Sequence, residues 1–267
     1  MVRHLSLKNN PVGMSAIISH PQSLPIDEQI RLFAAVGFDA FFLSAGVTDR
    51  FDLIPFWATV ARASGIAFEA VHAPSGGVNA VWQGGDEAAV YEKSARQIID
   101  LCAAGEVPKL VMHTGTSPAV TVSDMGIAFW QSLADYAQKR GVHLCFENAN
   151  TPLLLEAVLQ NTDRFHGFCH DTGHQLCYTP DIHYEHLFAD RLLFTHLHDN
   201  HASSDEHLLP QDGVFGWENY MTALKTAAYG GTLNLELSCT YAETYRQLPF
   251  SGFAKLAFSR ICTLKDL

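Results

Sequence analysis

Short apolar runs alternate along most of the chain with longer segments in which apolar residues recur at helical spacing. The runs have the length of buried strands, and the periodic segments have the length of helices. Strands are predicted at residues 14–18, 39–43, 66–72, 109–113, 142–147, 167–171, 192–196 and 232–237. Helices are predicted at residues 26–36, 51–64, 86–103, 153–159, 217–229 and 254–264, with one more that begins after a Ser123 cap.

This alternation of strand and helix predicts an α/β fold, a (β/α)8 TIM barrel that forms a single domain over residues 1–267. No repeats, linkers or low-complexity tracts divide the sequence. A doubly wound sheet is the rival architecture, but no GxGxxG motif follows the first predicted strand. The barrel is therefore the expected fold.

Polar residues recur at the carboxyl ends of the predicted strands, the end of a (β/α)8 barrel that carries the active site. They are His72, His113, Glu147, Asp171, His196 and Glu236. Because side chains alternate along a strand, the residue two positions earlier shares the inward face. Those positions are mostly small, with Phe194 as the exception, and the small ones are Ala70, Val111, Cys145, Cys169 and Asn234. The polar strand ends should thus converge on one site.

Three of these strand ends are carboxylates, Glu147, Asp171 and Glu236. Their apolar surroundings would bury them, and buried carboxylates close together raise one another's pKa values. A divalent cation removes this conflict. With His196 the carboxylates form a nitrogen and oxygen ligand set suited to Mn²⁺, Zn²⁺, Co²⁺ or Mg²⁺. Salt bridges to Lys or Arg are the alternative, but no basic residue lies beside these strand ends.

Other polar residues extend this candidate site. His72 and His113 could bind a second metal, orient a substrate or serve as hydrogen-bonded core histidines. His174 lies three residues beyond Asp171 and can face the same pocket. Asp205 and His207 have the spacing of a loop that folds back over the site, although a plain surface loop is the alternative. The role of His198, which shares the inward parity of His196, stays open, and His170 should point to the helix side.

Composition narrows the class of partner and the compartment. The formal net charge is −11, and no run of Lys or Arg occurs, which disfavours nucleic acid as a partner. The six cysteines include no CxxC pair, as expected for a reducing cytoplasm. No signal-like segment or membrane-spanning run is found, so a soluble cytoplasmic protein is expected. Homo-oligomerisation remains open.

Short motifs at the strand ends carry a family resemblance. They are HAP at His72, HTG at His113, FEN at Glu147, DTGH at Asp171, HLHD at His196, the following DEHLLPQDG and the strand of Glu236. In this order they resemble the xylose isomerase-like barrel superfamily, from about the third strand to the eighth. That group contains sugar isomerases and epimerases as well as endonuclease IV-type apurinic endonucleases.

The epimerase-like resemblance implies a metal held by the four residues of the first ligand set, Glu147, Asp171, His196 and Glu236. Glu147 and Glu236 would be the catalytic acid/base pair, and His174 would contact a substrate oxygen. The implied enzyme isomerises or epimerises a small sugar, polyol or sugar phosphate by proton transfer through a metal-stabilised enediolate. The implied cofactor is a divalent ion, Mn²⁺ or Zn²⁺ ahead of Co²⁺ or Mg²⁺, and the partner is a small carbohydrate.

The endonuclease-like resemblance gives the alternative function, a zinc-dependent phosphodiester hydrolase acting at abasic DNA. It adds five residues to a trinuclear zinc set, namely His72, His113, His174, Asp205 and His207. A barrel that binds a sugar or a metal without turnover is a third hypothesis. The sequence departs from many sugar-type members at Phe42, where they carry Glu, and at Ala202 and Ser203, where ketose epimerases often carry Arg.

Overall fold

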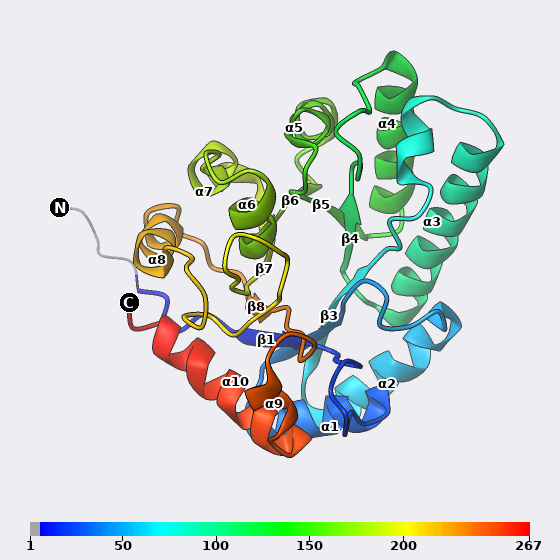
Figure 1. The fold of residues 1–267 in the computed structure, drawn as a ribbon. Coiled ribbons are helices and arrows are strands. Elements are labelled where there is room, and N and C mark those ends of the chain that lie inside the picture. Colours follow the sequence, from blue (N-terminus) through cyan, green and yellow to red (C-terminus); the bar gives the residue numbers. More distant parts are fainter. Residues whose placement is uncertain (1–5) are drawn as a thin grey trace.

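Eight parallel strands form the centre of the molecule, and helices surround them (Figure 1). The computed structural model describes residues 6–267. The strands pair in the order β7-β6-β5-β4-β3-β2-β1-β8, and a bridge between Leu197 and Leu235 joins the two ends of this order. The fold is therefore the predicted (β/α)8 barrel. The strands are β1 (Val12–Ser15), β2 (Ala40–Leu43), β3 (Ala67–His72), β4 (Lys109–His113), β5 (His143–Glu147), β6 (Gly167–Asp171), β7 (Leu192–His196) and β8 (Leu233–Leu235).

The helices follow the strands in the expected alternation. They are α1 (Ile26–Val36), α2 (Ile54–Ser64), α3 (Asp86–Gly105), α4 (Asp124–Gln138), α5 (Pro152–Asn161), α6 (Thr172–Tyr178), α7 (Tyr184–Leu187), α8 (Trp217–Thr226), α9 (Glu243–Arg246) and α10 (Phe250–Leu264). Short 3₁₀ turns occur at η1 (Phe51–Leu53), η2 (Val78–Trp82) and η3 (Ala189–Arg191). The predicted Ser123 cap is present, since its hydroxyl oxygen accepts from the Gly126 amide at 3.1 Å.

Two strands end earlier than predicted, because hydrogen bonds to side chains replace the backbone hydrogen bonds that would continue the sheet. The first strand stops at Ser15, and the amide and carbonyl of Ile17 pair instead with the Gln29 side chain, both at 2.8 Å. The last strand stops at Leu235, and the amide of Leu237 donates to the Ser15 hydroxyl at 3.3 Å. Both changes lie at the barrel end that carries the candidate site, where loops rather than strands are needed.

One layer of buried side chains fills the barrel interior below the polar strand ends. It consists of Phe42, Ala70, Val111, Cys145, Cys169 and Phe194. Five of these are the positions expected two residues before a polar strand end, and Phe42 joins them. The sixth expected position, Asn234, is also buried and contacts Glu69. The small residues leave room for the two rings, which meet edge to face with centroids 5.3 Å apart.

A charged pair closes the other end of the barrel. Lys109 Nζ lies 2.5 Å from Glu69 Oε1, and the Asn234 amide donates to Glu69 Oε2 at 3.2 Å. A register shift opposite β2 leaves Glu69 without a partner residue there, which lets Glu69 and Ala70 follow each other in the interior. The cation of Lys109 is thus held at the end opposite the candidate site.

Within residues 6–267, no helix combines the length and the apolar character that crossing a bilayer would require.

The start of β6 should not tolerate a side chain. A Cβ at Gly167 would lie 2.3 Å from the Arg191 carbonyl oxygen and 2.6 Å from Leu193 Cγ. We expect Gly167→Ala to lower the free energy of unfolding by about 1–3 kcal/mol through overpacking. Denaturant unfolding checks this, with Gly76→Ala as control because a Cβ there meets nothing within 4 Å. Equal stability of the two variants would contradict the packing at this position.

Candidate metal centre

The strand ends bring the six predicted polar residues together at one end of the barrel. His72, His113, Glu147, Asp171 and His196 close β3 to β7 in turn, and Glu236 follows β8 directly. All are buried except His113, which is half-buried. The predicted convergence on one site is therefore found.

Glu147 is the hub of the cluster. Its Oε2 atom lies 2.8 Å from His72 Nε2 and 2.7 Å from His113 Nε2. Its Oε1 atom lies 2.5 Å from His196 Nδ1. One carboxylate therefore contacts imidazoles from three different strands.

The other two carboxylates approach the same nitrogen of His196. Glu236 Oε2 lies 3.2 Å and Asp171 Oδ2 lies 3.8 Å from His196 Nδ1. Donor atoms of Glu147, Asp171, His196 and Glu236 all lie within 4.8 Å of one another. These are the four residues that the sequence groups as one ligand set, which we call the four-ligand group.

Charge in the cluster is shared between carboxylates and imidazoles. Burial alone would raise the pKa of Glu147, but the imidazoles of His196, His72 and His113 outweigh it and hold that pKa well below its usual range. Burial alone would lower the pKa of His196, yet Glu236 and Glu147 raise that pKa to about 9. In the metal-free protein at neutral pH, His196 therefore carries a proton between two carboxylates.

The donor set fits a divalent cation. Three carboxylates and one imidazole face a common space, and no Lys or Arg of residues 6–267 pairs with any of them. Oxygen and imidazole nitrogen donors suit Mn²⁺, Co²⁺ and Zn²⁺. A bound ion would replace the imidazole proton that otherwise balances the charge of the carboxylates.

A second group of donors lies beside the first, on the long loop after β7. Donor atoms of His198, Asp205 and His207 lie within 4.8 Å of one another. The loop therefore folds back over the site, as predicted for Asp205 and His207. Although burial opposes it, the hydrogen bond to Asp205 raises the pKa of His207 to about 9, and His174 and His207 hold the pKa of Asp205 well below its usual range.

His174 lies between the two groups. Its Nδ1 atom is 3.7 Å from Asp171 Oδ2 and 4.0 Å from Glu147 Oε1, and its Nε2 atom is 3.3 Å from Asp205 Oδ2. The pKa of His174 is raised well above its usual range because Asp171 and the other carboxylates outweigh its burial. The structure thus places His174 in the pocket that its spacing from Asp171 predicted.

A buried carboxylate holds the long loop in place. Asp199 accepts hydrogen bonds from the amides of Gln211 at 2.9 Å and Phe215 at 3.0 Å, and from Trp217 Nε1 at 2.7 Å. His207 sits in the left-handed region with φ 52°, a conformation that costs a non-glycine residue on the order of 1 kcal/mol. The bonds of Asp199 fix both sides of the segment and so support that conformation.

Two residues that position carboxylates of the site, Asn148 and Ser44, were not predicted from the sequence. Asn148 donates to the Asp171 carbonyl and accepts from the Asp171 amide, both at 2.8 Å, and so fixes the end of β6. Ser44 donates to Glu236 Oε1 at 2.5 Å. Signals for both were present, because Asn148 belongs to the FEN motif and Ser44 lies two residues beyond the inward-facing Phe42.

Phe42 itself lies below the site rather than in it. Its ring stacks on His196 with centroids 5.0 Å apart and 14° between the planes. The residue therefore sets the orientation of the imidazole that contacts all three carboxylates.

Several histidines lie outside the centre, among them His170, which was expected to point to the helix side. His201 is exposed and pairs with Glu206 at 2.8 Å. His170 faces the helices, where its Nε2 atom lies 2.6 Å from Gln175 Oε1.

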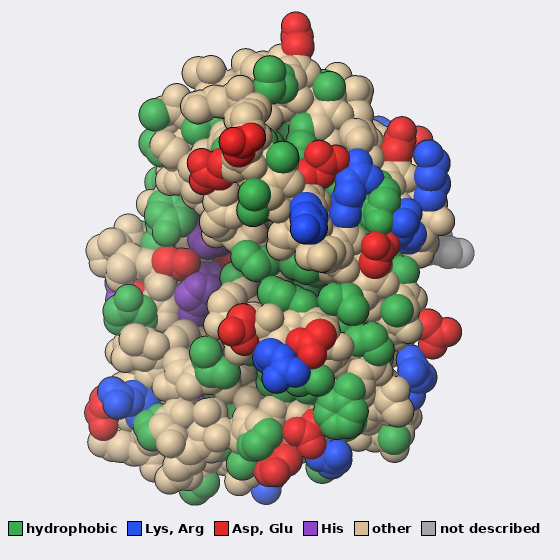
Figure 2. Space-filling view, turned by 90° about the vertical axis from the view of Figure 1, so that its right-hand side faces the viewer, with side chains coloured by type: hydrophobic (Ala, Val, Ile, Leu, Met, Phe, Trp, Pro, Cys, Tyr) green, Lys and Arg blue, Asp and Glu red, His purple; other side chains and the backbone are tan. Residues whose placement is uncertain are grey.

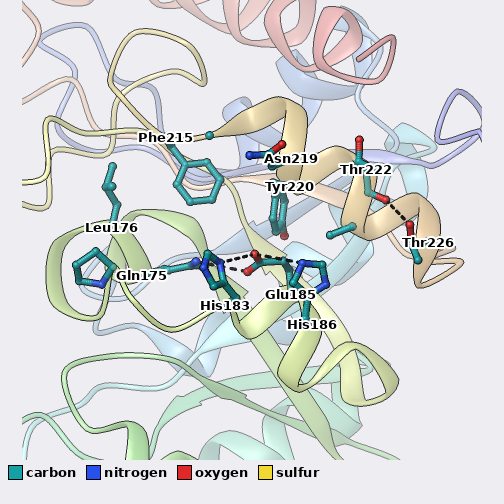
Figure 3. A pocket seen from close by; sticks show the side chains of 13 residues that line it. Gln175, Leu176, His183, Glu185, His186, Phe215, Asn219, Tyr220, Thr222 and Thr226 are labelled. Atoms are coloured by element: carbon teal, nitrogen blue, oxygen red, sulfur yellow. Dashed lines mark hydrogen bonds and ion pairs between the residues drawn. The ribbon is translucent and has the colours of Figure 1, made fainter.

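A separate cavity of about 480 Å³ lies between α6–α7 and α8 and is lined in part by Gln175. In this cavity His183 and His186 flank Glu185 (Figure 3). That cavity is lined by none of the four-ligand residues.

Surface charge is mixed on one face of the molecule. On the face in Figure 2, Lys and Arg side chains are interspersed with Asp and Glu, and histidine side chains are visible in a recess at the left of the view. Over the whole sequence the formal net charge is −11. That face therefore offers no continuous basic surface for a polyanion.

Comparison with known proteins points to one family. The sequence profile described as "Xylose isomerase-like TIM barrel" matches residues 30–249. Uncharacterized protein y4fM of Sinorhizobium fredii (strain NBRC 101917 / NGR234) is 32% identical over 154 residues, which make up 52% of this chain and 50% of that protein. The match therefore spans about half the length of this curated relative.

Two solved structures illustrate the likeness in three dimensions. D-psicose 3-epimerase from Clostridium cellulolyticum H10, solved with D-tagatose, has a TM-score of 0.74 and 16% identity over 94% of this chain and 99% of that chain. A fusion of a xylose isomerase-like TIM barrel with 4-hydroxyphenylpyruvate dioxygenase has a TM-score of 0.74 and 16% identity over 96% of this chain and 42% of that chain. At such identities the superpositions show a shared fold.

Metal binding should release protons. His196 and His207, whose pKa values are about 9, are protonated at pH 7 in the metal-free protein, and an imidazole must lose its proton to ligate an ion. We expect about one or more protons to leave per ion at pH 7, and affinity to rise with pH between about 7 and 9. Calorimetric titration of chelator-treated protein with Mn²⁺ or Zn²⁺, in buffers of different ionisation enthalpy, measures both effects.

The exposed His183 provides a control, because it lies outside both donor groups. His183→Gln should release the same number of protons as the unaltered chain. Binding heats that do not depend on the buffer would show that these imidazoles do not ligate the ion.

Proposed function

The chain belongs to the xylose isomerase-like TIM barrel family, and from this premise we propose that it is a divalent-metal-dependent isomerase or epimerase of a small sugar, polyol or sugar phosphate. The observation that carries the proposal is the four-ligand group, whose buried donor atoms lie within 4.8 Å of one another. The shared fold with D-psicose 3-epimerase supports it. The cytoplasm remains the proposed compartment.

A divalent ion held by Glu147, Asp171, His196 and Glu236 would supply Lewis-acid polarisation of a substrate carbonyl oxygen. Polarisation makes the hydrogen on the neighbouring carbon acidic, so that a carboxylate can remove it. The protein must in addition position carboxylates beside that carbon and keep them ionised.

Glu147 and Glu236 are the proposed proton-transfer pair. The surrounding imidazoles keep the pKa of Glu147 well below its usual range despite burial, so that it stays ionised. Glu236 lines a cavity of about 200 Å³ that opens beside the four-ligand group. Ser44 holds one oxygen of Glu236 at 2.5 Å and so orients the carboxylate toward that cavity. His174, which lies between the two donor groups, is proposed to contact a substrate oxygen.

The cavity beside Glu236 favours an uncharged substrate over a phosphorylated one. Its polar lining includes the hydroxyls of Ser19, Ser44 and Ser238, which can exchange hydrogen bonds with sugar hydroxyls. Of residues 6–267, no Lys or Arg lines it, although such cations are the usual partners of phosphate groups. Its volume of about 200 Å³ is smaller than the roughly 300–1,000 Å³ of pockets that bind drug-sized ligands. A cavity of this size suits a small sugar.

Zinc-dependent hydrolysis of a phosphodiester at abasic DNA is the second candidate. The observation that favours it is the succession of three neighbouring donor groups: His72, His113 and Glu147; the four-ligand group; and His198, Asp205 and His207. The net charge of −11 opposes it, since a duplex binder neutralises several phosphates. We therefore place it second.

Hydrogen exchange at the carbon next to a carbonyl tests the proposal. The metal-replete protein, incubated in D₂O with a panel of free and phosphorylated aldoses and ketoses, should incorporate deuterium into at least one of them. Glu147→Gln and Glu236→Gln should each slow this exchange by on the order of 10²–10⁴-fold, because each removes a general acid/base group. Mass spectrometry of the recovered sugars measures the exchange.

Glu218→Gln, which changes an exposed carboxylate on α8, is the matched control and should exchange at the unaltered rate. Unfolding midpoints of all variants show whether the fold is retained. Exchange with no member of the panel, combined with incision of an abasic duplex by the same preparation, would replace the isomerase proposal with the hydrolase.

A further inference from the structure

The cavity between α6–α7 and α8 lies apart from the metal centre and has a lining of its own (Figure 3). Its volume of about 480 Å³ falls within the roughly 300–1,000 Å³ that is usual for small-molecule sites. None of the strand-end residues of the candidate metal centre lines it. The proposed reaction therefore leaves this cavity without a role.

One carboxylate, Glu185, faces the cavity. Its side chain is only 10% exposed. Gln175 Nε2 donates to Glu185 Oε2 at 3.4 Å, which is long for a hydrogen bond. On the outer side, His183 Nδ1 and His186 Nε2 lie 3.1 Å and 4.0 Å from Glu185 Oε1, and both imidazoles are exposed, where ion pairs contribute little. A mostly buried carboxylate with partners as weak as these can accept a further donor that carries positive charge.

Buried neighbours hold Glu185 in this position. Gln175 Oε1 lies 2.6 Å from the Nε2 atom of His170, which is fully buried in β6. An amide oxygen can only accept, so His170 donates, and the amide N–H of Gln175 is directed to Glu185. The carboxylate is thus connected to the barrel wall and does not move freely.

Tyr220 brings a second polar group without a partner into the same cavity. The residue is 2% exposed, and no group of residues 6–267 forms a hydrogen bond with its hydroxyl. Burial, with the nearby charge of Glu185, raises the pKa of Tyr220 well above its usual range, so the hydroxyl stays neutral. Its ring is held edge to face between the rings of His170 and Phe215, and it extends from α8 toward Glu185 (Figure 3). Buried hydroxyls are normally paired, so this one is available to a ligand.

The charge and the walls of the cavity favour a cation. Of residues 6–267, no Lys or Arg lines the cavity, so an anionic ligand would meet Glu185 without a permanent positive charge to offset the repulsion. Phe215, Leu176 and Pro180 provide apolar walls. Aromatic rings such as those of Phe215 and Tyr220 attract cations through their faces.

We propose that this cavity binds a small organic cation, a primary amine whose ammonium group contacts Glu185 and Tyr220 while its apolar body packs against Phe215. An ammonium group carries three N–H donors, so it can reach the carboxylate and the hydroxyl oxygen together. The inference concerns binding alone and does not depend on the isomerase proposal.

Benzylammonium is the probe for this site, with benzyl alcohol and benzoate as neutral and anionic analogues of similar size. Calorimetric titration of the full-length chain measures the three affinities, with Mn²⁺ present to compete for the carboxylates of the four-ligand group. Benzylammonium should bind at one site per chain and more tightly than either analogue. Glu185→Gln should weaken its binding by on the order of 10–100-fold, because a charge-assisted hydrogen bond is lost, and should leave the binding of benzyl alcohol nearly unchanged.

Tyr220→Phe keeps the ring and removes the hydroxyl, so it should weaken the binding of benzylammonium by about 2–10-fold. Glu218→Gln removes an exposed carboxylate of α8 that does not line the cavity, and it should bind the probe as the unaltered chain does. Unfolding midpoints show whether each variant keeps its fold. Absence of binding at millimolar benzylammonium would overturn the proposal, as would equal affinities for the unaltered chain, Glu185→Gln and Tyr220→Phe, or tighter binding of benzoate.

Discussion

Four carboxylates meet at the carboxyl end of the barrel: Glu147, Asp171, Asp205 and Glu236. Within residues 6–267, the side chains that form ion pairs with them are all histidines. Negative charge of this density is unfavourable in a buried environment unless positive charge is supplied. Imidazoles can provide it by holding protons, and divalent ions can provide it by displacing those protons. The imidazoles that balance the carboxylate charge when they are protonated are also the groups that would ligate an ion. The proposed metal-dependent chemistry follows from this double role.

The rest of the barrel serves to keep these groups in place. Small interior residues below the site leave room for Phe42, whose ring supports His196 from beneath. Asn148 fixes the backbone of Asp171 through paired hydrogen bonds, and Asp199 fixes the loop that carries Asp205 and His207. Lys109, a cation of the barrel interior, is paired with Glu69 at the opposite end. Rigid support of this kind is what a preorganised site requires.

Alternation of apolar runs and periodic segments was enough to predict the barrel, because strand and helix periods differ and the units follow one another regularly. Strand parity was enough to predict which side chains converge, since the pleat fixes their direction. Parity puts Ser44 on the same side as the inward-facing Phe42, but it could not show that this loop residue reaches Glu236. It also could not show that Ile17 would leave β1 to pair with Gln29. The short helices α6, α7 and α9 were missed because they are too brief to show an apolar stripe. His198 could not be assigned from spacing, since its contacts arise from a loop that returns to the barrel.

Direct location of the ion is the most decisive measurement. Crystals grown with Mn²⁺ or Zn²⁺ and measured at the absorption edge of the metal would reveal its position by anomalous scattering. The account predicts a strong peak enclosed by Glu147, Asp171, His196 and Glu236. Absence of a peak there, with ions found only on the surface or in the cavity between α6–α7 and α8, would contradict it.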